Sequence, residues 1–105
     1  MATETMAAVK RKLNITWDDA GTDARVDDVI STVTPWLASR LGYEPGHAFT
    51  EEDGPAWGLF LSACLYEFSD AMDDFLSHYA EEISCTRAIV TASAREASDG
   101  SQAQG

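Results

Sequence analysis

Three side chains that could bind a metal ion stand at helical spacing in the second half of the chain. Asp74, His78 and Glu82 follow one another at every fourth residue, so they would share one face of a helix. Carboxylate-bundle proteins collect such ligands from several helices, including Glu-x-x-His pairs, but no second segment here offers a matching set. We therefore interpret these residues as a solvated ladder of charges rather than a metal site.

A short run of aspartates and a loop histidine are the other residues with possible catalytic chemistry. Asp70-x-x-Asp73-Asp74 superficially resembles the aspartate-rich motifs that hold magnesium diphosphate. Those motifs need a large apolar cavity and a second acidic motif, which a chain of this size and composition does not provide. His47 has no neighbouring nucleophile to activate, and no Gly-rich phosphate loop is present. The sequence predicts no catalytic residue, no cofactor and no metal, and we do not expect an enzyme.

The chain is strongly acidic, and its charges are unevenly distributed. Its 105 residues carry 18 Asp and Glu against 7 Lys and Arg, a net charge of -11. So few bases argue against sequence-independent binding of nucleic acid, because phosphates need cations to neutralise them. From Leu41 to Thr86 there are ten carboxylates and no Lys or Arg, whereas Lys10, Arg11 and Lys12 form a basic cluster. This cluster either complements a helix dipole or pairs with an acidic face on a neighbouring molecule.

The acidic stretch has two different faces if it is helical. At about 100° per residue, large apolar side chains form one stripe: Phe68, Met72, Phe75, Tyr79 and Ile83. Six acids lie on or near the other side: Glu67, Asp70, Asp73, Asp74, Glu81 and Glu82. We interpret the stripe as bundle core and the acids as a surface that faces either a DNA channel or a basic neighbour. Trp36 and Tyr66 are candidate residues of a subunit interface, where aromatic side chains are enriched.

The first two of four expected helices place the basic cluster. The first begins after a cap at Thr3 or Thr5, and the connector that follows is expected to be held to the core by Ile15 and Trp17. The second begins after a cap at Thr22 or Asp23 and ends at Gly42. Its buried stripe is expected to contain Val26, Val29, Ile30, Val33, Leu37 and Leu41. Pro35 lies inside this helix, so we expect a kink or break just before it.

The last two helices carry the acidic stretch. The third is expected from Pro55 to Phe68, after a loop whose end, Thr50 to Asp53, resembles a capping box. A bend at residues 69–70 should separate it from the fourth helix, because one unbroken helix would be unusually long. Cys64 and Cys85 show no redox or metal spacing, and each is expected to be a small buried apolar side chain.

Together these elements predict an all-α fold, a small bundle of about four helices with a flexible C-terminal tail. Residues 1–90 form the expected helical domain, and residues 91–105 form the tail, which is too small and polar to build a core. No apolar run approaches the ~18 residues that span a membrane. The first five residues show no secretory signal, so we expect a reducing cytoplasm or a particle assembled there.

Two segments of the sequence, in this order, resemble the head–tail connector (adaptor) proteins of tailed bacteriophages. The first runs from Val9 through the basic cluster to Asp19, and continues with Asp-x-x-x-Asp-Asp-Val-Ile at residues 23–30. The second, residues 64–83, matches the family's Phe-x-x-x-Tyr-x-x-Glu-Ile at residues 75–83. Two positions depart from the family pattern. Pro35 is unusual in the second helix, and only Arg87 matches the Leu-Arg that often follows.

This resemblance implies a structural protein in the neck of the virion, assembled in the host cytoplasm. Such proteins form a ring, typically dodecameric, below the portal protein. The ring extends the channel through which DNA passes without specific binding and docks stopper or tail-completion proteins. The C-terminal segment of relatives reaches the portal. For such a ring, our candidates for subunit or portal contacts are Lys10, Arg11, Lys12, Trp36, Tyr66, Arg87 and Arg95.

A binding module of another class is the alternative interpretation. An acidic helical protein can mimic DNA and inhibit a nucleic-acid-binding protein. The acids of such a mimic should follow the phosphate spacing of a duplex over the whole surface. Here they concentrate in one predicted helix, and the chain also carries a basic cluster.

Overall fold

The structure is a computed structural model that describes residues 2–17, 19–44 and 46–104, with side chains described for residues 5–17, 19–44 and 46–93. Within these residues four α-helices and one short 3-10 helix form the regular structure, and there is no strand. The elements are α1 (Ala2–Lys12), α2 (Ala20–Leu41), η1 (Glu51–Asp53), α3 (Pro55–Phe68) and α4 (Met72–Gln104). The predicted all-α bundle of four helices is confirmed.

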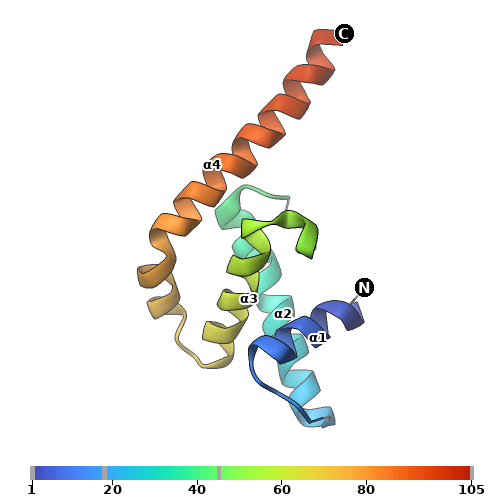
Figure 1. Ribbon diagram of the computed structural model, residues 1–105, viewed down its shortest axis with the longest axis vertical. Coiled ribbons are helices and arrows are strands. Elements are labelled where there is room, and N and C mark those ends of the chain that lie inside the picture. Colours follow the sequence, from blue (N-terminus) through green and yellow to red (C-terminus); the bar gives the residue numbers. More distant parts are fainter. Residues whose placement is uncertain (1, 18, 45, 105) are drawn as a thin grey trace.

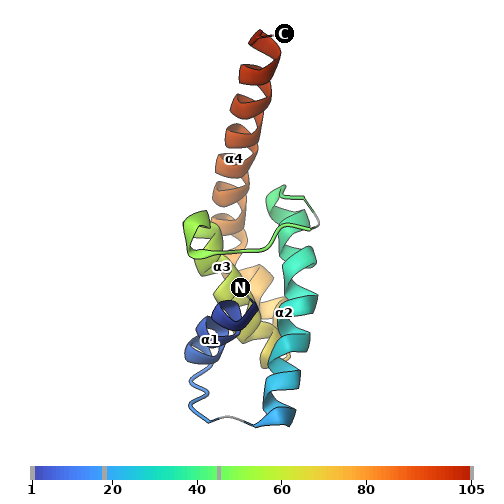
Figure 2. The ribbon, with the colours of Figure 1, turned by 90° about the vertical axis from the view of Figure 1, so that its right-hand side faces the viewer.

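The molecule is elongated, with extents of 53 × 30 × 18 Å. α2, α3 and the first half of α4 pack together, and α1 lies across α2 and α3 (Figures 1 and 2). The segment expected to be a flexible tail continues the backbone of α4 to Gln104 and projects beyond the other helices (Figure 1). None of the described helices is long and apolar enough to cross a membrane.

The core forms where the apolar stripes of the helices meet. α2 contributes Val26, Val29, Val33, Leu37 and Leu41 from the predicted stripe, all buried, whereas Ile30 is only half-buried. α3 buries Phe60 and Cys64, and α4 buries Phe75 completely. Phe68, Met72, Tyr79 and Ile83 pack against this core while remaining partly exposed. The apolar stripe of the acidic stretch therefore builds the bundle, as the helical periodicity predicts.

α2 differs from the prediction at its start and at its proline. Its N-cap is Asp19, not Thr22 or Asp23, and the Asp19 carboxylate accepts a hydrogen bond from the Thr22 amide at 2.9 Å. Of the kink or break expected between Ser31 and Thr34, the break is wrong, because α2 continues from Ala20 to Leu41 with Pro35 inside it. Pro35 and Ser31 are both exposed, and Pro35 has no amide hydrogen to donate to the Ser31 carbonyl.

Three left-handed residues end α1, α2 and α3: Asn14 (φ 61°), Gly42 (φ 87°) and Asp70 (φ 59°). In each case the residue that follows the left-handed one donates its amide hydrogen to the carbonyl of the residue five positions before it, as in a Schellman motif. These bonds are Ile15 to Lys10 (2.8 Å), Tyr43 to Ala38 (2.9 Å) and Ala71 to Tyr66 (2.8 Å). The predicted end at Gly42 and the predicted bend at residues 69–70 are thus confirmed, and the bend returns α4 along α3.

Candidate functional site

The basic cluster at the end of α1 divides into one inward and two outward side chains. Lys10 Nζ lies 2.8 Å from Asp23 Oδ1, and the Lys10 side chain is only 12% exposed. This ion pair ties α1 to α2 within one molecule. Arg11 and Lys12 are exposed in the last turn of α1, so they are the members of the cluster that face outward.

Trp17 lies outside the core that it was expected to join. Its side chain is 54% exposed, whereas Ile15 is buried. Because Asp19 caps α2 earlier than predicted, Trp17 belongs to the capping turn, and its Nε1 donates to Thr22 Oγ1 at 3.4 Å. Arg11, Lys12 and Trp17 are all exposed along the segment that leads from α1 into α2, and we call these three residues the tip; Figure 2 shows the segment.

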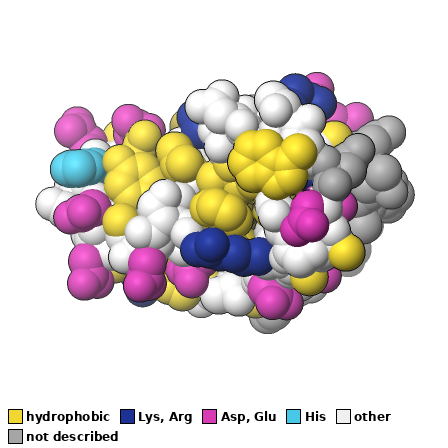
Figure 3. Space-filling view, turned by 90° about the horizontal axis from the view of Figure 1, so that it is seen from below, with side chains coloured by type: hydrophobic (Ala, Val, Ile, Leu, Met, Phe, Trp, Pro, Cys, Tyr) yellow, Lys and Arg dark blue, Asp and Glu magenta, His cyan; other side chains and the backbone are white. Residues whose placement is uncertain are grey.

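The predicted acidic face is real on α4 but does not extend through one helix. Asp73, Asp74, Glu81 and Glu82 are exposed on α4, Asp70 is exposed in the turn before it, and Glu67 is half-buried on α3. Seen from below, acidic side chains gather along the edge at the start of α4, with hydrophobic and basic side chains next to them (Figure 3). The helical projection in the sequence analysis treated all six acids as if they lay on one continuous helix. In the structure the bend at residues 69–71 separates Glu67 on α3 from the acids of α4.

The two aromatic interface candidates share a contact with Phe75. The centroid of the Phe75 ring lies 6.0 Å from that of Trp36 and 5.6 Å from that of Tyr66. Arg40 stacks over the outer face of Trp36, with its Cζ 4.4 Å from the ring centroid. Both candidates remain half-buried, so each joins the core to the surface.

The possible metal ligands of α4 do not gather around a common point. Among the described residues, no group of three His, Cys, Asp or Glu side chains is arranged to hold a metal ion. His78 instead turns toward α3, where its Nδ1 lies 3.2 Å from the Tyr66 hydroxyl. This contact helps to join α4 to α3.

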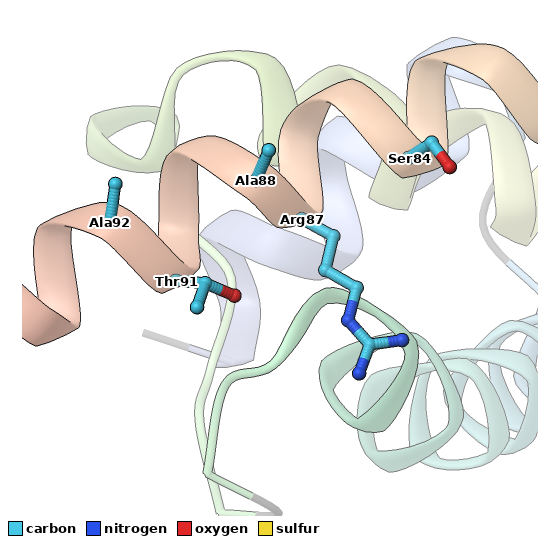
Figure 4. Close-up of a pocket in the computed structure, with 5 residues that line it drawn as sticks. All are labelled: Ser84, Arg87, Ala88, Thr91 and Ala92. Carbon is cyan, nitrogen blue, oxygen red and sulfur yellow. The ribbon is translucent and has the colours of Figure 1, made fainter.

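Arg87 lies further along α4, in a shallow surface hollow. The hollow has a volume of about 370 Å³ and is lined by Ser84, Arg87, Ala88, Thr91 and Ala92. Figure 4 shows Arg87 extended away from the helix, and the side chain is exposed. Thr91 lies beside Gly42, so the hollow adjoins the end of α2. The side chain of Arg95 lies outside the described residues.

The loop between α2 and α3 carries a constellation that the sequence analysis missed. His47 stacks flat on Tyr43, with centroids 3.9 Å apart, and its Nε2 lies 3.1 Å from Asp53 Oδ2. Asp53 Oδ2 also accepts from the Thr50 amide at 2.8 Å, the bond expected of the predicted capping box. Burial, followed by the Asp53 charge, raises the pKa of Tyr43. The capping motif was visible in the sequence, but nothing in the spacing indicated the stacking.

This loop closes one side of a groove with a volume of about 620 Å³. Four apolar residues that line it are buried or half-buried and form its floor: Ile30, Phe49, Trp57 and Phe60. Three exposed acids form its rim: Asp27, Glu51 and Glu52. No Lys or Arg is among the described residues that line it. We call this surface the acidic groove.

Arg25 is a second residue that the sequence analysis missed. It reaches from α2 to the end of α3, where its guanidinium donates to the Phe68 carbonyl at 2.9 Å and lies 4.2 Å from the Phe68 ring centroid. An arginine is well suited to this position because the last carbonyls of a helix lack intrahelical donors and carry partial negative charge. Arg25 therefore joins α2 to α3 within one molecule.

The two cysteines occupy different environments. Cys64 is buried as expected, and burial together with the Glu67 charge raises the pKa of its thiol to about 12. Cys85 is exposed on α4, so the expectation of burial is wrong for this residue. It lies on the polar side of a helix whose opposite side already covers the core with Tyr79, Ile83 and Thr86.

No protein-family model matches the sequence, and no curated protein or solved structure matches it.

Proposed function

We propose that this protein is a structural, non-enzymatic subunit of a ring at the head–tail junction of a tailed bacteriophage. The observation that carries the proposal is the separation of charge on the folded chain. An exposed basic surface, Arg11 and Lys12, lies apart from the acids of α4 and of the groove. Copies with a net charge of -11 repel one another. Placing basic surface against acidic surface offsets this repulsion where copies meet.

Two different complementary surfaces on one subunit favour head-to-tail assembly. Contacts of this kind generate a ring when the rotation between neighbours closes. The two segments that resemble head–tail connectors lie in α1 with the start of α2, and in the α3–α4 hairpin. The likeness thus falls on elements that pack together in the bundle, which supports assigning this chain the same role.

A surplus of carboxylates suits a ring around a DNA channel. Acids that face the lumen repel the phosphates of DNA, so the genome can pass without being held. In the proposed assembly the ring is dodecameric and sits below the portal protein. The projecting end of α4 reaches the portal, and the opposite side docks stopper or tail-completion proteins. Assembly would take place in the host cytoplasm.

Electron microscopy of the purified protein, alone and with the portal protein of the same genome, tests this proposal. We expect closed rings of this protein on the portal. A protein that stays monomeric with the portal contradicts the proposal. If that monomer instead competes with DNA for a nucleic-acid-binding protein, the function is that of an acidic DNA mimic.

A further inference from the structure

We propose that the tip of one copy of this protein docks into the acidic groove of a second copy. The inference rests on the proposed function in that it names the contact between neighbouring subunits. It differs from the simplest expectation, in which the basic cluster would meet the acids of α4. The groove combines charge with an apolar floor, and the tip offers the complement of both.

The groove can hold a large apolar side chain beside cations. Its floor presents Phe49 stacked on Phe60, with centroids 5.2 Å apart, and Phe60 stacked on Trp57 at 5.5 Å. Phe49 and Phe60 are themselves buried, 2% and 1% exposed, so the floor residues with surface left for an incoming ring are the partly exposed Trp57 and Ile30. Glu51 and Glu52 stand exposed on η1 at its rim. Its volume of about 620 Å³ lies within the range of about 300–1,000 Å³ typical of ligand pockets, so it can accept an indole ring.

The tip is the described surface that matches this groove. Trp17 and Ile89 are the two exposed large hydrophobic residues of the described chain, and Trp17 is the one that follows a pair of exposed bases. The Lys10–Asp23 ion pair fixes the end of α1 against α2, and the Asp19 cap fixes the turn that carries Trp17. The tip is therefore held in place before binding, which lowers the entropic cost of association.

The two surfaces lie on different parts of the molecule, so one copy can use both at once. The tip is at the end where α1 joins α2, whereas the groove is closed by the α2–α3 loop further up the bundle (Figures 1 and 2). Contacts between tip and groove would therefore join copies head to tail. Trp17 is the expected anchor, since tryptophan and arginine are common among residues that dominate binding energy.

Cysteine cross-linking tests the contact directly. The variant Thr16→Cys/Thr50→Cys, in a Cys85→Ser background, places one thiol beside Trp17 and one at the groove. Cys64 is buried and its thiol pKa is about 12, so it should not compete. We expect mild oxidation to give a ladder of disulfide-linked multimers. The control Thr16→Cys/Ser77→Cys places the second thiol beside the acids of α4, and we expect no ladder from it.

Charge reversal distinguishes the groove from α4. In the wild-type background, Glu51→Lys/Glu52→Lys should lower the self-association constant by at least about tenfold, because it places two cations against the bases of the tip. Glu81→Lys/Glu82→Lys makes the same change in net charge on α4 and should not lower it. Combining Glu51→Lys/Glu52→Lys with Arg11→Glu/Lys12→Glu should restore association. Trp17→Ala should abolish it while Trp17→Phe retains most of it, with circular dichroism confirming the fold.

The outcomes separate this inference from the proposed function. Rings on the portal without the cross-link between residues 16 and 50 would overturn the inference and leave the proposed function standing. A cross-linked ladder without rings on the portal would support the inference and contradict the proposed function. Cross-linking through residue 77 instead of residue 50, or loss of association on reversing Glu81 and Glu82 alone, would also overturn the inference.

Discussion

The α3–α4 hairpin and the α2–α3 loop each contain a cluster of aromatic rings, but they use these rings differently. In the hairpin, Phe75 is fully buried and its ring contacts Trp36, Tyr66 and Tyr79. In the loop, Tyr43 and His47 stack on each other and meet Phe49 edge-on, and Phe49 in turn stacks on Phe60 and lines the groove. The hairpin cluster is therefore structural, whereas the loop cluster also shapes a surface.

The acids show the same contrast. Those of α4 are exposed on the helix surface, and none of them lines the acidic groove or the hollow at Arg87. Those of the groove surround an apolar floor. Charges increase the rate at which a complementary partner is encountered. An apolar surface beside them can in addition bury apolar side chains of that partner, as the core of an interface does. The groove is for this reason the better candidate for a specific contact.

Replacing Phe75 should have the largest effect on stability. Phe75→Ala removes a fully buried ring and should lower the free energy of unfolding by about 3–5 kcal/mol. Denaturant unfolding followed by circular dichroism measures this loss. Leu76→Ala, at a half-buried neighbouring position, is the control and should cost less. Equal effects of the two changes would show that the hairpin cluster is not the centre of the α3–α4 packing.

Replacing Phe49 should have the next largest effect. Phe49→Ala should lower the free energy of unfolding by about 3 kcal/mol, at the low end for a buried phenylalanine because the loop can partly collapse. It should also weaken self-association, since Phe49 forms the floor of the groove. Sedimentation velocity and denaturant unfolding provide the two readouts. A change in stability without any change in association would make the loop cluster purely structural, like the hairpin cluster.

Asp70 offers a stabilising change at the turn that starts the hairpin. Its backbone is left-handed (φ 59°), a conformation that glycine adopts without steric cost. Asp70→Gly should raise the free energy of unfolding by about 0.5 kcal/mol, because greater freedom of the unfolded chain offsets part of the gain. Ser77→Gly, inside α4, should instead lower it by about 1 kcal/mol. Destabilisation by both changes would mean that the Asp70 carboxylate contributes more than its backbone costs.

The smallest expected effect on stability comes from Asp19, the N-cap of α2, and it depends on pH. Hydrogen bonds from Thr22, first from its amide and then from its hydroxyl, hold the pKa of Asp19 below its usual value of 3.8. A carboxyl group with a lowered pKa stabilises the fold above its unfolded pKa, and this contribution is lost as the pH falls through the folded pKa. Asp19→Asn should therefore melt below the wild type at neutral pH, and the difference should shrink below pH 3.8. A difference that stays constant across this range would contradict the role of the charged cap.

The sequence predicted the four helices but gave no indication of the groove. Apolar residues at helical spacing, such as Val33 and Leu37, predicted the buried side of α2, and Gly42 predicted its end. Pro35 did not break α2 as one of the two expected outcomes had it, because a proline removes one helical hydrogen bond without ending the helix by necessity. Trp17 was expected to contact the core because it is hydrophobic, but hydrophobicity indicates burial only on average, and the side chain is exposed. The stacking of His47 on Tyr43 had no signal, since contacts made by an irregular loop follow no fixed period.

Mixing two singly disabled variants tests most directly whether two different surfaces join copies of this protein. One variant lacks two of the three tip residues (Lys12→Ala/Trp17→Ala), and the other lacks two of the three acids at the rim of the groove (Glu51→Gln/Glu52→Gln). Each alone should be monomeric by native mass spectrometry, because each has only one working surface. Their equimolar mixture should give a heterodimer and nothing larger, since the intact tip and intact groove can meet only once. A mixture that stays monomeric, or that grows into larger assemblies, would contradict head-to-tail association through the tip and the groove.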